Sequence, residues 1–378
     1  MKKKVSLYIH IPFCASKCFY CDFNSYSGLE DKISSYFDAL AKEIALHKNK
    51  FGKLEINTIY IGGGTPSYVE SKYIYNIIND INRNFTVPEN VEMTIESNPG
   101  TISYQKLMAY KAIGINRLSI GFQSMDDTLL KKLGRIHNSL EAVKCFEESR
   151  KAGFKNINVD LIFGIPGQTL NQWGKTISAI IKMDPEHISA YSLNIEKGTP
   201  LFEKIEQGLI EKPDDVIDRD MYYIAIERFL KSGYNHYEIS NFSKDGYRCS
   251  HNLTYWKCFP YIGIGAGAHS YFNKNRFNNT PDVEEYINSL QSDNFEFENI
   301  EKINDKRHMS EYIFLGLRLV EGIDAKDFNK RFKVEIFDLF ADEIKRTVKK
   351  QLVEIEGDII RLTSKGLDYA NEVFVEFI

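Results

Sequence analysis

The stretch H-I-P-F-C-A-S-K-C-F-Y-C-D-F-N, residues 10–24, carries three cysteines, Cys14, Cys18 and Cys21, at C-x3-C-x2-C spacing. Thiolates are soft ligands, and three held together by a short loop favour an iron–sulfur cluster. Zinc is the alternative, but a structural zinc site uses four closed ligands, and the neighbouring histidine and aspartate lack the usual finger spacing. A disulfide set is disfavoured because the number of cysteines is odd and no secretory signal precedes them.

Outward from this loop, the first half of the sequence alternates short apolar segments with segments of helical periodicity. We expect six strands, at residues 5–11, 54–61, 91–96, 115–121, 157–163 and 187–193. Six strands that are each followed by a helix indicate a parallel α/β sheet or barrel. Polar or Gly/Pro motifs follow the strands, where α/β barrels build their active sites. Six units instead of eight predict an incomplete, TIM-like (β/α)6 barrel.

The regular alternation of strands and helices ends after the sixth unit. We therefore expect the chain to have three parts. Residues 1–240 form the barrel, residues 241–299 a connecting segment, and residues 300–378 a small α+β domain. The last part has three helices, a hairpin and a final helix, as in a winged helix. Winged helices often bind DNA, but residues 301–378 hold 14 Lys and Arg against 16 Asp and Glu. Because phosphate contacts dominate nucleic-acid affinity, we expect no nucleic-acid partner.

The bulk composition is that of an ordinary globular protein. Of the 378 residues 43% are hydrophobic and 26% are charged, and the net charge is −4. No apolar run reaches the roughly 18–20 residues of a membrane span. With reduced cysteines and no export signal, we expect a cytoplasmic protein.

Three thiolates around a four-iron cluster leave one iron without a protein ligand, and S-adenosylmethionine can chelate that iron. The cysteine stretch resembles the radical S-adenosylmethionine (radical SAM) superfamily. The residues around it narrow the resemblance to the branch related to the oxygen-independent coproporphyrinogen III oxidases, and within it to the HemW-type heme chaperones. The resemblance implies a partial barrel that binds a 4Fe-4S cluster and S-adenosylmethionine, with heme as cargo.

The resemblance also implies a set of residues that line S-adenosylmethionine. Gly62-Gly63-Gly64 follows the second strand, as a glycine motif does in the family, and its carbonyls would receive the ammonium group. The residues carried over in this way are Tyr8, Tyr20, Gly63, Gly64, Thr65, Glu96, Gln123, Arg135 and Asp160. Sulfonium and ammonium groups attract carboxylates, and a carboxylate attracts arginine. Taken singly, each residue also has an ordinary structural interpretation, such as a helix cap or a buried acid.

Two short sequence segments distinguish the chaperone branch of the family from the oxidase branch. The oxidases carry a further cysteine two residues after the third, where this chain has Phe23. The motif H-N-x-x-Y-W at residues 251–256 resembles the chaperone branch, and imidazole beside aromatic rings suits heme. His251 is therefore the expected heme ligand, with Cys249 and Cys258 as alternatives and a hydrogen-bonded structural histidine as the ordinary interpretation.

The favoured function is that of a heme chaperone which delivers heme to apo heme proteins. The resemblance implies respiratory enzymes at the inner face of the membrane as recipients, and a homodimer. An oxygen-independent coproporphyrinogen III oxidase is the alternative, and a radical enzyme of unknown substrate is a third. No residue is assigned a catalytic role.

Overall fold

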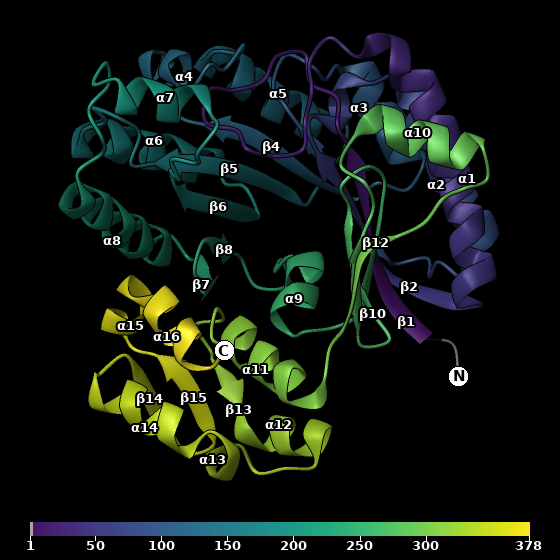
Figure 1. The fold of residues 1–378 in the computed structure, drawn as a ribbon. Coiled ribbons are helices and arrows are strands. Elements are labelled where there is room, and N and C mark those ends of the chain that lie inside the picture. Colours follow the sequence, from purple (N-terminus) through teal and green to yellow (C-terminus); the bar gives the residue numbers. More distant parts are fainter. Residues whose placement is uncertain (1–2) are drawn as a thin grey trace.

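The computed structural model describes residues 3–378, which form one large curved sheet and a small second unit (Figure 1). Six neighbouring parallel strands make up the centre of the sheet, as predicted. They are β1 (Lys3–Ile11), β2 (Leu54–Gly63), β3 (Glu92–Ser97), β4 (Arg117–Gln123), β5 (Ile157–Phe163) and β6 (His187–Ser192). The sheet does not close on itself, so the prediction of an incomplete (β/α)6 barrel is confirmed.

Helices follow these strands and cover the outer face of the sheet. They are α1 (Ile33–Phe51), α2 (Ser71–Asn84), α3 (Tyr104–Ala112), α4 (Asp127–Lys132), α5 (Ser139–Lys151), α6 (Leu170–Met183), α7 (Pro200–Glu206) and α8 (Asp215–Lys231). Local sequence explains where they begin. Asn138 and Thr169 each form a capping box with the residue three positions on, which satisfies free backbone N–H groups at the starts of α5 and α6.

The sheet extends beyond the barrel strands at both ends, so that it has twelve strands in the order β12-β11-β10-β9-β1-β2-β3-β4-β5-β6-β8-β7. The added strands are β7 (Asn235–Glu238), β8 (Asn241–Ser243), β9 (Tyr261–Ile264), β10 (His269–Phe272), β11 (Asn275–Asn278) and β12 (Glu298–Lys302). Residues 241–299, which we expected to form a connecting segment, contribute four of these strands together with α9 (Ser250–Trp256) and α10 (Val283–Gln291). The expected division at residue 300 falls inside β12.

Residues 303–378 build a second hydrophobic core, below β7 and α9 in the view of Figure 1. Its helices are α11 (Asp305–Gly316), α12 (Ala325–Phe332), α13 (Ile336–Leu339), α14 (Ala341–Lys349), α15 (Ser364–Asp368) and α16 (Ala370–Glu376). Its strands are β13 (Ile323–Asp324), β14 (Val353–Glu356) and β15 (Ile359–Leu362), in the order β13-β15-β14. Phe340 separates α13 from α14 and Tyr369 separates α15 from α16, because the backbone leaves the helical region at these two residues.

Side chains of the barrel strands alternate between an apolar outer face and a polar inner face. The outer face packs under the helices with residues such as Leu7, Ile9 and Ile59. Polar side chains from neighbouring strands meet on the inner face: Ser119 donates to Asp160 at 2.9 Å, and Tyr60 donates to Glu96 at 2.9 Å. The interior of the barrel is thus a polar chamber.

A buried carboxylate fastens α1 to the loop that follows β9. Glu43 is completely buried and accepts hydrogen bonds from His47 Nε2 at 2.9 Å, the Gly265 amide at 2.9 Å, Asn279 Nδ2 at 2.8 Å and Tyr286 Oη at 2.5 Å. A Cβ atom at Gly265 would lie 2.7 Å from the His10 carbonyl oxygen. The glycines of this loop therefore permit close approach of two backbones.

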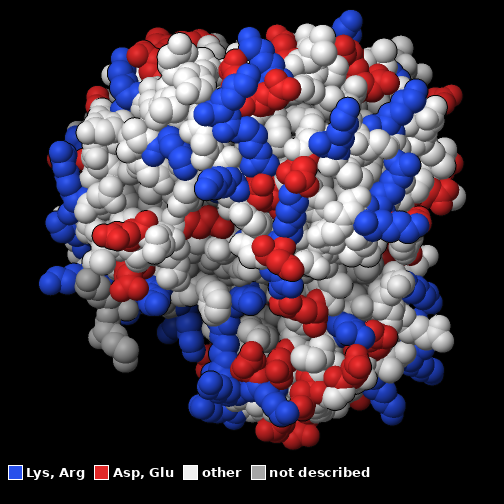
Figure 2. Space-filling view, turned by 180° about the vertical axis from the view of Figure 1, so that it is seen from behind, with Lys and Arg blue, Asp and Glu red and all other residues white. Residues whose placement is uncertain are grey.

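Positive and negative side chains alternate over the face shown in Figure 2, without a broad area of one sign. Within residues 3–378, no helix has the combination of length and apolar character that crossing a membrane requires.

Candidate functional site: a cysteine loop at the mouth of the barrel

The cysteine loop leaves β1 at its carboxyl end and is held to the barrel by backbone hydrogen bonds. The amide of Cys14 donates to the Tyr26 carbonyl at 2.8 Å, and the amide of Tyr26 donates to the Pro12 carbonyl at 2.7 Å. Tyr8 Oη donates to His10 Nδ1 at 3.0 Å, because His10 Nε2 donates to the Asn24 carbonyl at 2.7 Å. The end of β1 and the end of the loop are therefore fixed relative to each other.

All three cysteines of the loop are free thiols, and each contacts a different polar group. Cys14 Sγ lies 3.4 Å from Thr65 Oγ1, Cys21 Sγ lies 3.8 Å from Ser25 Oγ, and Arg135 Nη1 lies 3.5 Å from Cys18 Sγ. Burial raises the pKa of the Cys14 and Cys21 thiols, so their thiolates require a positive partner.

The arrangement of these thiols bears on the alternatives that the sequence left open. Nowhere in residues 3–378 do three His, Cys, Asp or Glu side chains gather closely enough to hold a metal ion. As placed here, the three thiols form no closed site around a single ion, and a structural zinc site would also require a fourth ligand. A multi-iron cluster occupies a wider space between its thiolates, and three soft donors without a fourth fit such a group.

The glycine motif at the end of β2 makes room for the cysteine loop. A Cβ atom at Gly64 would lie 2.9 Å from both Cys14 Sγ and the Phe13 carbonyl oxygen. A Cβ atom at Gly63, whose φ is 115°, would lie 2.6 Å from the His10 ring. In this structure the two glycines thus seat the loop itself, a role that the family resemblance did not indicate.

Two carboxyl groups face the chamber below the loop. Glu96 accepts hydrogen bonds from Tyr60 Oη and, at 3.1 Å, from the Gly63 amide. Burial and the nearby charge of Asp160 raise the pKa of the Glu96 carboxyl to about 7. Burial also raises the pKa of Asp160, which accepts a hydrogen bond from Asn158 at 2.7 Å. Tyr8 and Tyr60 stack on the same wall, with 6.3 Å between ring centroids.

Arg135 joins the cysteine loop to the fourth strand. Its Nη2 donates to Asn98 Oδ1 at 2.6 Å and to the Gly121 carbonyl at 2.9 Å. Asn98 in turn donates to Thr65 Oγ1 at 2.9 Å, so this asparagine, which was not predicted, connects two predicted residues. A small pocket opens here, lined by Ala15, Ser16, Cys18, Thr65, Asn98, Thr101, Gly134, Arg135 and Ile136.

The remaining predicted residues lie on the same side of the barrel. Tyr20 packs against the apolar cluster around Leu129, and burial raises the pKa of its phenol, against the charge of Arg135. Gln123 ends β4 with a positive φ of 65°, and its Nε2 lies 2.9 Å from where a Cβ of Gly121 would be. The structure therefore gathers all nine residues of the expected S-adenosylmethionine set around the carboxyl ends of β1 to β5.

His251, the expected heme ligand, is buried and hydrogen-bonded through both ring nitrogens. Its side chain is 1% exposed, Nδ1 is hydrogen-bonded to Thr58 Oγ1 at 2.7 Å, and Nε2 to Tyr255 Oη at 2.9 Å. Both nitrogens are occupied, and burial together with the charge of Arg117 lowers the pKa of the imidazole to about 3. In this structure His251 holds α9 against β2, which matches the ordinary structural interpretation of a buried, hydrogen-bonded histidine.

The two cysteines that flank the motif are no more available as ligands. Cys249 and Cys258 are buried, and burial raises the pKa of their thiols to about 12 and about 11. Phe23, in contrast, is 64% exposed at the rim of the cysteine loop, so the position of the additional family cysteine carries an exposed phenyl ring.

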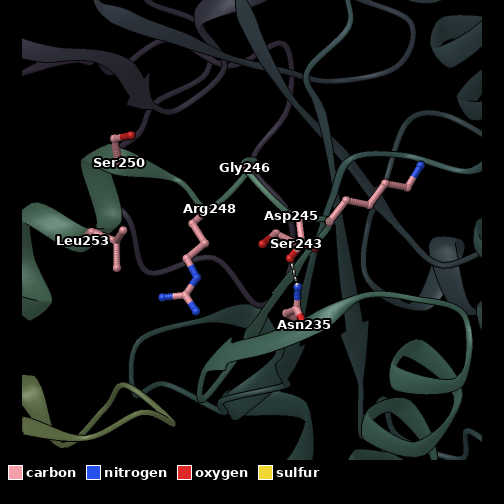
Figure 3. Close-up of a pocket in the computed structure, with 8 residues that line it drawn as sticks. Asn235, Ser243, Asp245, Gly246, Arg248, Ser250 and Leu253 are labelled. Carbon is pink, nitrogen blue, oxygen red and sulfur yellow. Dashed lines mark hydrogen bonds between the residues drawn. The ribbon is translucent and has the colours of Figure 1, made fainter.

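A second pocket lies away from the cysteines, between the β7–β8 hairpin and the start of α9 (Figure 3). Asn235 donates to Asp245 across it at 2.6 Å. Its two cations are already paired, Lys244 with Asp184 and Arg248 with Glu321, both at 2.7 Å. The pocket therefore has no unpaired cation to offer to a ligand, and its one carboxylate, Asp245, is hydrogen-bonded to Asn235.

Comparison with known proteins agrees with this geometry. Residues 8–180 match the Radical SAM superfamily, and residues 303–369 match the HemN C-terminal domain. The chain is 36% identical to the heme chaperone HemW of Bacillus subtilis, with 99% of each chain covered. It is 33% identical to HemW of Lactococcus lactis, with 100% of this chain and 98% of the relative covered. The structure superposes on coproporphyrinogen III oxidase (HemN) from Escherichia coli with a TM-score of 0.87, at 22% identity, over 100% of this chain and 90% of that one.

Proposed function

The chain belongs to the HemW family of the radical SAM superfamily, and on this premise we propose that it is a heme chaperone. It binds a 4Fe-4S cluster, S-adenosylmethionine and heme, and it passes heme to apo heme proteins. The observation that carries the proposal is the full-length similarity to proteins named heme chaperones, which extends through both the barrel and the C-terminal unit.

The cluster would be held by Cys14, Cys18 and Cys21, because they are the free thiols of one anchored loop. The fit is supported by Gly64, which leaves room for the loop where a larger residue would displace Cys14. When bound, such a cluster supplies one-electron chemistry and an iron with an open coordination position. The guanidinium of Arg135 then lies beside a thiolate, where it offsets negative charge.

S-adenosylmethionine would lie in the mouth of the barrel, on the nine residues gathered there. Its ammonium and sulfonium groups favour the ionised forms of Glu96 and Asp160, whose pKa values burial has raised. Tyr8 and Tyr60 supply aromatic faces on the wall beside Glu96. Arg135 lies within reach of the cysteine loop and matches a carboxylate group.

Heme and its recipient are further steps of the same proposal. The exposed Phe23 supports the chaperone over a coproporphyrinogen III oxidase, since the oxidases have a further cysteine at this position. In line with the family, we propose that respiratory enzymes at the inner face of the membrane receive the heme and that the chaperone acts as a homodimer.

The proposal is tested on anaerobically purified protein with a reconstituted cluster, given two separate challenges. The first is heme, followed by absorption and by transfer to an apo heme protein. The second is coproporphyrinogen III with S-adenosylmethionine and a reductant, followed by formation of protoporphyrinogen. We expect stable heme uptake and transfer without porphyrinogen turnover. Turnover combined with weak heme binding would instead identify an oxidase.

A further inference from the structure

Two arginine side chains among residues 3–378 form no ion pair and donate no hydrogen bond. Arg117, on β4, is enclosed in the barrel with 2% of its surface exposed. Arg318 follows α11 at the junction of the barrel and the C-terminal unit and is only half-buried, so a ligand can reach it. A guanidinium taken from water without a partner is costly, and Arg318 therefore retains unused binding capacity.

Aromatic rings hold the Arg318 side chain in place without satisfying its hydrogen-bonding groups. Its Cζ lies 4.4 Å from the centroid of the Trp256 ring and 5.9 Å from that of Phe374. The Nε atom of Arg318 and the Nε1 atom of Trp256 are both buried and have no hydrogen-bond partner. Two neighbouring donors thus lack an acceptor, and both belong to residues in contact with each other.

The barrel side of this junction does not supply the acceptor. The Ile239 amide donates to the Arg318 carbonyl at 3.1 Å, and Glu238 forms a β-bridge with Leu319. Even so, the Glu238 carboxylate forms no ion pair with Arg318, and its Oε2 has no partner. Burial raises the pKa of Glu238 to about 7, while the charge of Arg318 acts in the opposite direction, so the two groups attract each other without the direct contact of an ion pair.

The junction continues into the chamber of the barrel. Asn241, beside Glu238, pairs with Ser189 of β6, and Tyr191 lies two residues further along that strand. Tyr191 is 40% exposed, although the charges of both Asp160 and Glu238 reach its phenol and burial raises its pKa. Tyr191 therefore lies within range of an acid of the barrel, Asp160, and of the acid at the junction, Glu238.

We propose that Arg318, stacked on Trp256, binds a carboxylate of the cargo, so that the propionate side of heme faces the C-terminal unit. The inference rests on the proposed function. It also gives a role to the tryptophan of the H-N-x-x-Y-W motif: His251 fixes α9, and Trp256 orients the guanidinium.

The chemistry of the junction favours a carboxylate over other anions. A guanidinium and a carboxylate form paired, charge-assisted hydrogen bonds in a fixed plane. A phosphate dianion fits less well, because its second negative charge would be opposed by the neighbouring Glu238 carboxyl. The apolar macrocycle would cover Tyr191, while a propionate would pair with the terminal Nη groups of Arg318, which are not among its buried atoms.

The experiment compares two ligands, heme and its dimethyl ester, in which both propionates are neutral. Full-length protein is used in four forms: wild type, Arg318→Met, Arg318→Lys and a control, Arg361→Met, on the exposed β14–β15 hairpin. Dissociation constants are measured by absorption titration, and folding is checked by circular dichroism. The comparison of ligands on the wild type requires no substitution and is independent of any effect on folding.

We expect wild type to bind heme about tenfold more tightly than the ester, because a charge-assisted pair is lost with the ester. Arg318→Met should weaken heme binding about tenfold and leave ester binding within about twofold, with Arg318→Lys between wild type and Arg318→Met. Arg361→Met should match wild type. Equal affinity of wild type for both ligands, or an equal loss for both in Arg318→Met, would overturn the inference and leave the proposed function standing. Wild type that binds neither ligand would refute the proposed function as well.

Discussion

Replacement of Gly64 by alanine tests the seating of the cysteine loop most directly. The new Cβ atom would lie 2.9 Å from Cys14 Sγ and from the Phe13 carbonyl oxygen, whereas ordinary contact begins at 3.4 Å. The loop must therefore retreat by about 0.5 Å, and backbone cannot rotate away as a flexible side chain can. Because φ of Gly64 is not positive, the effect is purely steric.

This displacement equals the tolerance of a preorganised site, which is about 0.5 Å. We expect Gly64→Ala to keep about half or less of the wild-type iron and sulfide after reconstitution. Overpacking should also lower the free energy of unfolding of the apo-protein by about 1–3 kcal/mol. Iron and sulfide are measured per chain, and unfolding is followed in urea.

Gly174→Ala is the matched control. Gly174 lies within α6, and the nearest atom to an added Cβ is Nη1 of the flexible Arg228, at 3.4 Å. Alanine at a helix position is favourable by about 0.5–1 kcal/mol, so this variant should hold full iron and be at least as stable as wild type. Full iron content and unchanged stability in Gly64→Ala would refute the proposed seating, as would equal loss of iron in the control.

Three further predictions concern the ligands, the core and the acid of the chamber. Cys18→Ser should lose most of the cluster iron yet unfold as wild type does, because Cys18 lies outside the hydrophobic core; retained cluster absorption would contradict the ligand assignment. Glu43→Ala should lower the free energy of unfolding, measured in urea, by about 3–5 kcal/mol, since four buried donors lose their acceptor. A decrease of less than about 1 kcal/mol would contradict this prediction. The pKa of Glu96 rises from its ordinary 4.5 to about 7 in the folded chain, so its contribution to stability falls as pH increases between these values. Glu96→Gln should therefore flatten the decline in apo-protein stability between pH 5 and 7, and an unchanged slope would count against the burial of this acid.

The central fold could be predicted because its strands are long and apolar. The strands β1 to β6 are buried on the helix-facing side, so their sequences are rich in isoleucine, leucine and valine. The strands added at the edges could not be found in this way. β8, β11 and β12 read Asn-Phe-Ser, Asn-Arg-Phe-Asn and Glu-Asn-Ile-Glu-Lys, and pairing with distant neighbours, not composition, makes them strands.

Within the candidate site, only the features that depend on spacing along the sequence could be predicted. The cysteines lie close together in the sequence, so their spacing could be recognised. Asn98 could not be identified, because an asparagine before Pro-Gly is an ordinary turn residue, and its partner Arg135 is 37 positions away. The hydrogen bonds of His251 could not be foreseen for a similar reason: Thr58, which is hydrogen-bonded to its Nδ1, is 193 positions distant.

The position of β1 has a consequence for the synthesis of the protein. β1 pairs with β2 on one side and with β9 on the other, and β9 begins only at Tyr261. While the ribosome makes the intervening residues, one edge of β1 remains without its partner strand. At about 5–20 residues per second this interval lasts tens of seconds, during which the unpaired edge is open to other chains. Among the strands of the sheet, the one that leads into the cysteine loop is thus made first and is among the last to gain both of its neighbours.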